Sequence, residues 1–431
     1  MLLSETDQKI TPGRVRGTVE APSSKSYAQR ALAAALLCCG ESTLLDLDVC
    51  GDTRAALSVI GNLGARVSAS DDTPGKRSVT GGIGADRRFS PVSEILNVGE
   101  SGLSARLFTP IAALCDRRMT ITGEGSLTRR PLSMMEEPLR RLGVEINSRD
   151  GFLPIVLRGP LRGGEAEVDG SLSSQFITGL LMALPLAGKE STVRVNDLKS
   201  KPYIDMTIAI AETFGVRIEH HNYKEFFIPA KPCYQPAACR IEGDWSGASC
   251  LLVAGAVAGE VTVGKLNPDS LQADKAIMEA LARAGAEIIF DGHRVTVRRR
   301  ELRAFEFDAT HCPDLFPALA ALAANCEGET LLYGTHRLTH KESDRAATLA
   351  REFSALGIPV NISRYDVMRI RGGRIAGGHV ESHNDHRIAM AMAVTALNAA
   401  SPVTISGADA VGKSYPGFWK EMEGIILNSE F

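Results

Sequence analysis

The stretch Leu63-Gly64-Ala65-Arg66-Val67 decides the fold, because its pattern returns four more times along the chain. In each copy an apolar residue is followed by glycine, a small or branched residue, any residue, and then valine or isoleucine. The glycines of the five copies, 70 to 79 residues apart, are Gly64, Gly143, Gly215, Gly285 and Gly357. A helix that is closed by a glycine and runs directly into a strand explains each copy.

A second series of segments keeps the same spacing and predicts buried helices. Each segment begins with small polar or charged residues and continues as a run rich in alanine and leucine. The segments start at Ser24, Ser101, Ser173, Asp244, Asp314 and Asp385. Helices that are apolar on every side are buried. The two series together predict six units of about 70 residues, each with two helices and intervening strands, for example at 191–195, 261–263 and 294–297.

Length and composition set the domain count and the class of ligand. A chain of 431 residues exceeds what one hydrophobic core usually holds, which predicts two domains with three units each. Hydrophobic residues make up 44% and charged residues 23%, as in ordinary soluble proteins. The net charge of −3 argues against a general nucleic-acid or membrane surface. If the ligands are anionic, the cationic side chains that bind them must be concentrated at the binding site.

Cysteine usage and the N-terminus favour a cytoplasmic location. The nine cysteines are scattered, without a CxxC pair or a His/Cys cluster of zinc spacing, as expected in a reducing compartment and for a protein without a structural metal. Residues 1–11 are polar and lack the apolar core of a signal peptide. The apolar run 31–39 is too short to span a bilayer.

Cations at the predicted helix starts indicate an anionic ligand. Capping explains the serines and aspartates there, but the positive end of the helix dipole disfavours cations. The cations at or near these starts are Lys25, Arg30, Arg106, Arg130, His386 and Arg387. They imply a phosphorylated or carboxylated ligand that offsets their charge.

Three local motifs sharpen this expectation. The segment 21–30 lacks the spacing of a P-loop, so it does not indicate nucleotide binding. Pro131 suits the first turn of a helix, which would place Arg130 at that helix start. The cluster 341–345 is either a solvated charged face or a carboxyl group held among cations, which would be an acid–base candidate.

Taken in order, these motifs resemble the EPSP synthase family of enolpyruvyl transferases. The segments that carry the resemblance are Ser24-Lys25-Ser26 with Arg30, Gly99 to Arg106, Arg130-Pro131, Ser173-Ser174-Gln175, Ser200-Lys201-Pro202-Tyr203, Lys341 to Arg345, Asp385-His386-Arg387 and Lys413-Ser414-Tyr415-Pro416. The resemblance implies a two-domain α/β fold, an inside-out α/β barrel built from six βαβαββ repeats, three per domain. It places residues 1–20 and 243–431 in the first domain and 21–242 in the second, with the active site in the interdomain cleft.

The resemblance also implies an activity and its residues. Such an enzyme joins phosphoenolpyruvate to shikimate 3-phosphate without cofactor or metal, and we expect a monomer that binds neither nucleic acid nor membrane. The residues expected to hold shikimate 3-phosphate are Lys25, Ser26, Arg30, Ser173, Ser174, Gln175, Ser200, Tyr203, Asp314 and Lys341. Those expected around phosphoenolpyruvate are Lys25, Gly102, Arg130, Gln175, Arg345, His386, Arg387 and Lys413.

We expect three residues to carry out the proton transfers of this reaction. We expect Glu342 to protonate the methylene carbon of phosphoenolpyruvate, and Asp314 with Lys25 to handle the proton of the attacking hydroxyl. The chain departs from the family pattern at Glu100 and Leu103, where asparagine and threonine are common. Glu100 adds negative charge beside an anion pocket, so we expect weak inhibition by glyphosate, the family's characteristic inhibitor.

Two alternatives remain. A transferase that uses UDP-N-acetylglucosamine resembles this chain in fold, but usually carries a reactive cysteine in a loop rich in glycine and arginine. Cys115 instead follows the apolar run that begins at Ile111, as a core residue would, and Ser26 stands where that enzyme has asparagine. The second alternative is a non-catalytic anion-binding paralogue.

Overall fold

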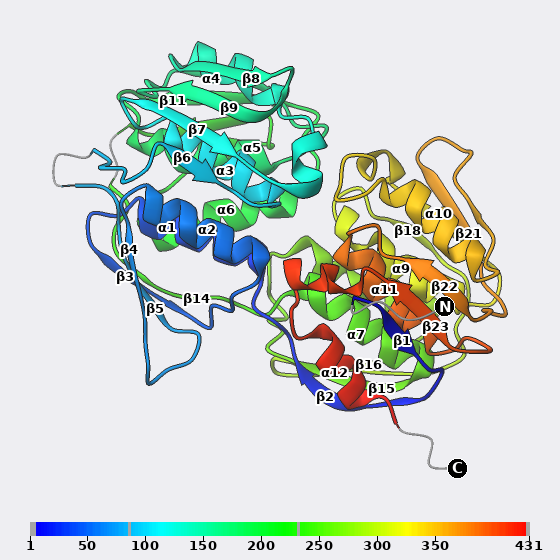
Figure 1. Cartoon of the computed structure of the whole chain (residues 1–431). Helices are drawn as coiled ribbons and strands as arrows, with labels where there is room; N and C mark the ends of the chain where they lie inside the picture. The colour runs from blue at the N-terminus through cyan, green and yellow to red at the C-terminus, as the bar shows by residue number, and fades with distance from the viewer. Residues whose placement is uncertain (1–5, 85–87, 231–232, 428–431) are drawn as a thin grey trace. The chain divides into compact units, whose positions relative to one another are not determined.

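The computed structural model describes residues 6–84, 88–230 and 233–427 (Figure 1). The chain divides into two compact units: unit 1 comprises Met1–Ser24 and Glu242–Phe431, and unit 2 comprises Lys25–Ile241. In the described part of the chain, no helix is long and apolar enough to cross a membrane.

Unit 2 contains three copies of one βαβαββ pattern. The middle copy runs β6 (Ile95–Asn97), α3 (Gly102–Ala112), β7 (Arg118–Thr122), α4 (Glu136–Arg141), β8 (Glu145–Arg149), β9 (Phe152–Arg158). Strand β7 is parallel to β6 and antiparallel to β9, and β9 is antiparallel to β8, so the sheet order is β6-β7-β9-β8. A helical crossover therefore joins the parallel pair and a hairpin closes the sheet.

The other two copies of unit 2 repeat this sheet order. One runs β10 (Glu165–Asp169), α5 (Gln175–Ala183), β11 (Ser191–Asn196), α6 (Lys201–Thr213), β12 (Glu219–His221), β13 (Glu225–Ile228). The other comprises α1 (Lys25–Leu36), β3 (Glu41–Leu45), α2 (Gly51–Asn62), β4 (Arg66–Ala69), β5 (Arg77–Thr80), β14 (Ala238–Arg240). Strand β14 comes from the far end of the unit, yet it pairs in parallel with β3 and so completes the copy that begins with α1.

Unit 1 has two sheets of the same kind and one that differs. The first copy comprises β2 (Val15–Glu20), α7 (Trp245–Ala258), β15 (Gly259–Gly264), α8 (Ile277–Ala284), β16 (Glu287–Asp291), β17 (Arg294–Arg298). The second comprises β18 (Glu306–Asp308), α9 (Phe316–Ala324), β19 (Glu329–Tyr333), α10 (Arg345–Ala355), β20 (Val360–Asn361), β21 (Val367–Arg371). The third comprises β22 (Gly378–Glu381), α11 (His386–Ala396), β23 (Val403–Ser406), α12 (Phe418–Ile425), β1 (Gln8–Ile10). This last sheet has the order β1-β23-β22, because β1 supplies the antiparallel partner of β23 and no hairpin follows α12 in the described chain.

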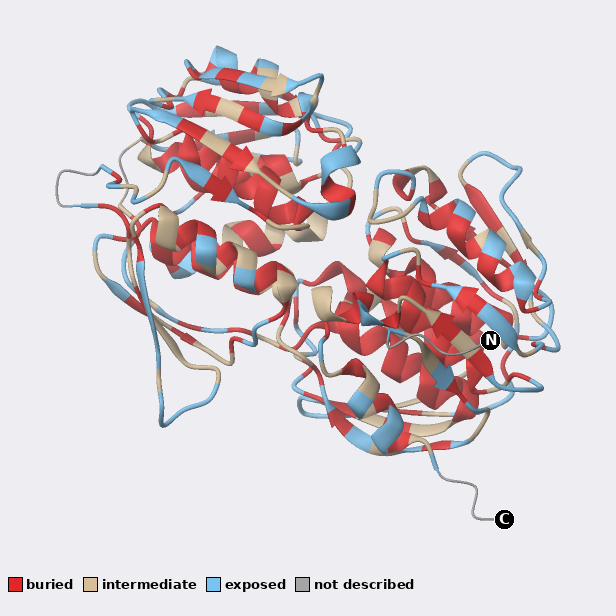
Figure 2. Cartoon of the chain, in the orientation of Figure 1, coloured by how far each residue is buried: buried red, intermediate tan, exposed pale blue. Residues whose placement is uncertain are grey.

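Helices form the interior of each unit and sheets form its outside. In unit 1 every residue of α7, α9 and α11 is buried, and the three helices contact one another. In unit 2 all of α3 is buried, and α3 contacts α1 and α5. Figure 2 shows the buried helices inside strands that alternate between buried and exposed residues. The expectation of apolar helices buried on every side, with sheets outside them, is confirmed.

The repeated glycines have the conformation that the sequence predicts. The φ angles of Gly64, Gly143, Gly215, Gly285 and Gly357 lie between +80° and +102°. Each glycine follows a helix closely and precedes a strand. A side chain is disfavoured at such an angle, which accounts for the recurrence of glycine.

Candidate functional site

A buried arginine organises the polar cluster of unit 1. Arg345 is the first residue of α10, and its side chain is 1% exposed. Its Nη1 lies 2.6 Å from Oδ1 of Asp314, its Nη2 lies 2.7 Å from Oε2 of Glu342, and its Nε lies 2.8 Å from Oδ2 of Asp385. Burial lowers the pKa of Arg345, but the charges of Asp385, Glu342 and Asp314 outweigh that effect and hold the pKa well above its ordinary value. Three carboxylates from separate segments thus converge on one guanidinium.

Asp314 is the carboxylate with the most cationic partners in this cluster. Besides Arg345, Nζ of Lys341 lies 3.1 Å from its Oδ1, and Nη2 of Arg387 lies 3.8 Å from its Oδ2. Burial lowers the pKa of Lys341, although the charge of Asp314 partly offsets this. The pKa of Arg387 is raised, since the charge of Asp314 and other acids outweighs the effect of burial. The structure therefore brings together the predicted residues Asp314, Lys341, Glu342, Arg345 and Arg387.

His386 and Lys413 are the other predicted residues of unit 1. His386 is the first residue of α11 and fully buried, and its Nδ1 lies 4.0 Å from Oδ1 of Asp385. Lys413 ends the 3-10 helix η7 (Ala408–Lys413), which packs against α11. Both residues thus lie on or against α11, whose capping residue Asp385 binds Arg345.

Asp274 and Asp385 belong to this cluster but were missed in the assignment of site residues. Asp385 caps α11 by accepting a hydrogen bond from the backbone N–H of Arg387 at 3.0 Å, besides binding Arg345. Asp274 is 2% exposed, and burial together with the negative charge of Asp314 raises its pKa to about 6. A capping aspartate was visible in the sequence, but its second partner was not, because the two lie 40 residues apart.

In unit 2 the predicted residues gather at the N-termini of four helices. Lys25 begins α1, and its Nζ lies 3.0 Å from Oδ2 of Asp52 in the first turn of α2. Part of the anionic charge expected beside Lys25 is therefore supplied by the protein, and the sequence did not reveal this partner. Ser200 precedes α6 with φ of +55°, and its carbonyl accepts a hydrogen bond from the N–H of Tyr203.

Arg30 is buried among uncharged partners. Its side chain donates hydrogen bonds to the Ser26 carbonyl at 2.7 Å, the Thr207 hydroxyl at 2.9 Å, the Thr178 hydroxyl at 3.2 Å and the Tyr203 carbonyl at 3.3 Å. Burial lowers its pKa to about 10, so the guanidinium remains charged at neutral pH. No carboxylate pairs with it within the described residues, so uncharged oxygens alone satisfy this buried positive charge.

Gly102 and two arginines meet at the N-terminus of α3. Nη1 of Arg106 donates to the Gly102 carbonyl at 3.1 Å and to Oε1 of Gln175 at 3.3 Å. A Cβ atom added to Gly102 would lie 2.6 Å from Nη1 of Arg130. Gln175 begins α5, and the preceding Ser173 and Ser174 lead into that helix. The predicted residues at the N-termini of α3 and α5 are thus neighbours.

The expectation that Pro131 opens a helix is wrong. Arg130 follows the 3-10 helix η1 (Gly125–Arg129) with an extended conformation, φ −92° and ψ 130°, and the next helical turn starts only at Ser133. The steric effect of proline on the preceding residue accounts for the extended Arg130. Arg130 still lies at a helix start, but that helix is α3.

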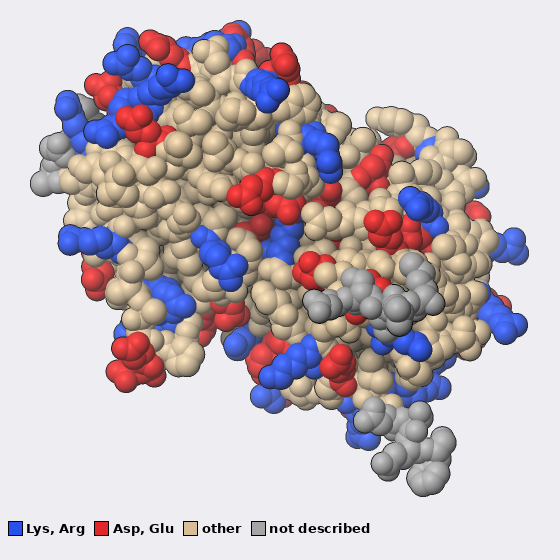
Figure 3. All heavy atoms as spheres, viewed as in Figure 1, with Lys and Arg blue, Asp and Glu red and all other residues tan. Residues whose placement is uncertain are grey.

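The two clusters differ in charge balance. In unit 1, Lys341, Arg345 and Arg387 face a similar number of carboxylates. In unit 2, the side chains gathered at the helix starts are mostly cationic, and Asp52 is the acidic partner found for Lys25. Elsewhere acidic and basic side chains are interspersed, as the face drawn in Figure 3 shows. Unit 2 is therefore suited to bind anions, and unit 1 adds carboxyl groups suited to proton transfer.

The two departures from the family pattern lie beside this anion site. The Glu100 carboxylate accepts hydrogen bonds from the backbone N–H and the hydroxyl of Ser126, both at 3.1 Å. Leu103 is the second residue of α3 and is 7% exposed. Cys115 is buried, and burial raises its pKa to about 12, so at neutral pH it is a thiol and a poor nucleophile, as expected for a core residue. Within the described ranges, no group of three or more His, Cys, Asp or Glu side chains is arranged to hold a metal ion.

Comparison with known proteins gives the family of the chain. Residues 10–422 match the family model described as EPSP synthase (3-phosphoshikimate 1-carboxyvinyltransferase). The 3-phosphoshikimate 1-carboxyvinyltransferase of Clostridium perfringens is 36% identical over 427 residues, which cover 98% of this chain and 99% of the relative. That of Methanocella arvoryzae is 38% identical over 421 residues, covering 96% and 97%.

Solved structures show the same fold. The EPSP synthase of Acinetobacter baumannii matches with a TM-score of 0.81 and 25% identity, covering 98% of both chains. The enolpyruvyl transferase NikO from Streptomyces tendae matches with a TM-score of 0.76 over 97% of this chain and 96% of its own, at 17% identity, which shows a shared fold. With a family model that spans nearly the whole chain and relatives that match end to end, the protein belongs to the EPSP synthase family.

Proposed function

We propose that this protein transfers the enolpyruvyl group of phosphoenolpyruvate to the 5-hydroxyl of shikimate 3-phosphate, giving 5-enolpyruvylshikimate 3-phosphate and phosphate. This is the shikimate-pathway step toward chorismate and the aromatic amino acids. The observation that carries the proposal is the family match over residues 10–422 of a chain in which Asp314, Lys341 and Glu342 gather around the buried Arg345.

The cationic helix starts of unit 2 would bind the substrate anions. Shikimate 3-phosphate would contact unit 2 through the residues Lys25, Ser26, Arg30, Ser173, Ser174, Gln175, Ser200 and Tyr203. Charged hydrogen bonds and helix N-termini both favour phosphate. Asp314 and Lys341 of unit 1 would complete this set.

Phosphoenolpyruvate would bind the remaining cations. Its proposed partners are Lys25, Gly102, Arg130, Gln175, Arg345, His386, Arg387 and Lys413. The arginines would neutralise the charge that builds on the carboxylate and the departing phosphate as the tetrahedral intermediate forms and collapses. Residues of both units are therefore needed for turnover.

Two carboxyl groups would move the protons. Glu342 would protonate the methylene carbon of phosphoenolpyruvate, while Asp314, aided by Lys25, would take the proton of the attacking hydroxyl. An anion that arrives at Arg345 competes with Glu342 for that guanidinium. A carboxylate that loses its arginine partner binds a proton more readily, which would prepare Glu342 to act as an acid.

The test is phosphate release from purified protein given both substrates, with each substrate omitted in turn. Release that requires both supports the transferase. Ligand-induced stabilisation without phosphate release would instead indicate a non-catalytic anion-binding protein. Release with UDP-N-acetylglucosamine in place of shikimate 3-phosphate would support the sister activity, which the buried Cys115 thiol disfavours.

We also propose that the protein acts as a monomer in the cytoplasm, on small-molecule substrates and without nucleic acid or membrane. The mixed charge of the face drawn in Figure 3 and the net charge of −3 support the absence of a nucleic-acid or membrane partner. Light scattering during size-exclusion chromatography, with and without both substrates, tests the oligomeric state.

A further inference from the structure

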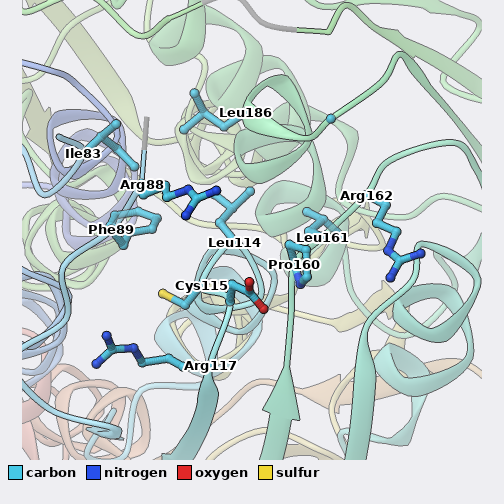
Figure 4. Close-up of a pocket in the computed structure, with 12 residues that line it drawn as sticks. Ile83, Arg88, Phe89, Leu114, Cys115, Arg117, Pro160, Leu161, Arg162 and Leu186 are labelled. Atoms are coloured by element: carbon cyan, nitrogen blue, oxygen red, sulfur yellow. The ribbon is translucent and has the colours of Figure 1, made fainter. Parts of the chain in front are cut away.

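Unit 2 contains a cavity of about 450 Å³ (Figure 4). It lies at the opposite end of the buried helices from the residues assigned to substrate. Gly102 and Gln175 begin α3 and α5, whereas the cavity is lined by residues that follow the ends of these helices, such as Leu114 and Leu186. The 11 residues of α3 alone span about 16 Å. The volume lies within the range usual for small-molecule sites.

Backbone contacts fix two walls of this cavity against each other. The N–H of Leu161 donates to the Ala113 carbonyl at 2.7 Å. A Cβ atom added to Gly159 would lie 2.0 Å from that same carbonyl oxygen and 2.5 Å from the carbonyl oxygen of Cys115. The segment leading to Pro160 therefore packs directly on the end of α3. Such walls form the cavity before any ligand arrives, which lowers the entropic cost of binding.

The floor of the cavity is apolar. Ile83, Phe89, Cys115 and Leu161 line it and are between 3% and 9% exposed. Burial raises the pKa of Cys115 to about 12, so its thiol adds no charge at neutral pH. Phe89 contributes an aromatic ring to the lining, which favours a planar apolar group as the body of the ligand.

The rim of the cavity is cationic. Arg88, Arg117 and Arg162 contribute to the lining, and Asp116 is the acidic residue among them. Figure 4 shows Arg117 and Arg162 on different sides of Cys115 and Leu161. In the described part of the chain, the guanidinium groups of Arg117 and Arg162 donate no hydrogen bond to the protein. Their donors are therefore available to a carboxylate or phosphate, which guanidinium binds with two parallel hydrogen bonds.

We propose that this cavity binds a small anion with a planar apolar body, of the class of aromatic carboxylates and aryl phosphates. The ring packs on Phe89 and Leu161, and the anionic group pairs with Arg117. The site is separate from the residues assigned to phosphoenolpyruvate and shikimate 3-phosphate, and it does not depend on the proposed activity.

Isothermal titration calorimetry on the full chain tests this site with 2-naphthoate as the probe. We expect one molecule to bind per chain, and both 2-naphthalenemethanol, which lacks the charge, and inorganic phosphate, which lacks the ring, to bind at least about tenfold more weakly. Shikimate 3-phosphate at saturating concentration should leave the affinity for 2-naphthoate unchanged.

Two exposed arginines provide matched variants. Arg117→Ala should weaken 2-naphthoate binding about threefold to tenfold, since it removes a charged hydrogen-bond donor at a partly solvated rim. Arg118→Ala removes the next arginine, which is exposed but not part of the lining, and should change the affinity less than twofold. Absence of binding, displacement by shikimate 3-phosphate, or an equal loss in both variants would overturn the proposal.

Discussion

Oε2 of Glu342 lies 2.7 Å from Nη2 of Arg345, a guanidinium that is 1% exposed and also binds Asp314. The two carboxyl groups proposed to move protons are therefore held by one buried cation. Charge-assisted hydrogen bonds to a buried guanidinium are strong and directional, so they position the carboxyl groups as well as neutralise them. Positioning and proton transfer can be separated by a substitution that keeps the shape of Glu342 and removes its acidity.

Glu342→Gln should lower turnover about 100-fold or more and leave substrate binding largely intact. The amide oxygen can still accept a hydrogen bond from Arg345, but the group cannot deliver a proton. Phosphate release measures turnover, and the substrate-induced rise in melting temperature measures binding. Glu327→Gln, at an exposed position of the same unit, is the control and should behave as wild type. Near-normal turnover of Glu342→Gln would refute the assignment.

Gly102→Ala should raise KM for phosphoenolpyruvate about tenfold, because the new Cβ would lie 2.6 Å from Nη1 of Arg130 and displace that guanidinium. Steady-state kinetics with shikimate 3-phosphate held saturating measure the effect. Gly61→Ala is the matched control, since a Cβ atom there meets nothing within 4 Å. An unchanged KM in Gly102→Ala would show that Arg130 does not contact phosphoenolpyruvate through this geometry.

The parts of the fold that the sequence predicted are those set by local conformation. A helix that ends on Gly64 or Gly285 with positive φ is a property of a few adjacent residues, and so is the start of a helix at Lys25 or His386. The six repeats followed from these local signals because they recur at one spacing. Completion of a sheet by a distant strand, as β14 does beside β3, depends on packing and left no such signal.

The pairing of charges in the candidate site could not be read from the sequence. Lys25 binds Asp52 across 27 residues and Arg345 binds Asp385 across 40, and either aspartate could equally have been a solvated helix start. Two rules also competed at Pro131, which suits a first helical turn but forces the preceding Arg130 into an extended conformation. The second rule prevailed.

Glyphosate should inhibit this protein weakly, with an inhibition constant above the sub-micromolar range, because Glu100 places negative charge beside the proposed anion site. Glu100→Gln keeps an acceptor for the Ser126 N–H and hydroxyl but removes the charge, so it should lower the inhibition constant about threefold to tenfold. Glu124→Gln, which changes an exposed glutamate that directly precedes η1, is the control. Sub-micromolar inhibition of the wild type would contradict the expectation.

Asp274→Asn should stabilise the protein more at pH 7.5 than at pH 4.5. Burial and the charge of Asp314 raise the pKa of Asp274 to about 6 in the folded state, against about 3.9 in an unfolded chain. The folded state therefore binds more protons between these values, and wild-type stability falls as pH rises through 6. Relative to a neutral side chain, Asp274 costs about 3 kcal/mol at pH 7.5, where the folded carboxyl is ionised, and about 1 kcal/mol at pH 4.5, where it takes up a proton on folding. The variant avoids this cost, so its advantage over wild type should be about 2 kcal/mol larger at the higher pH.

Urea unfolding at both pH values measures the difference in stability between Asp274→Asn and wild type. Asp269→Asn, which changes an exposed aspartate of the same unit, should show no such difference. An advantage that is constant or larger at pH 4.5 would mean that Asp274 is ionised at little cost, held by Arg387 more than it is opposed by Asp314.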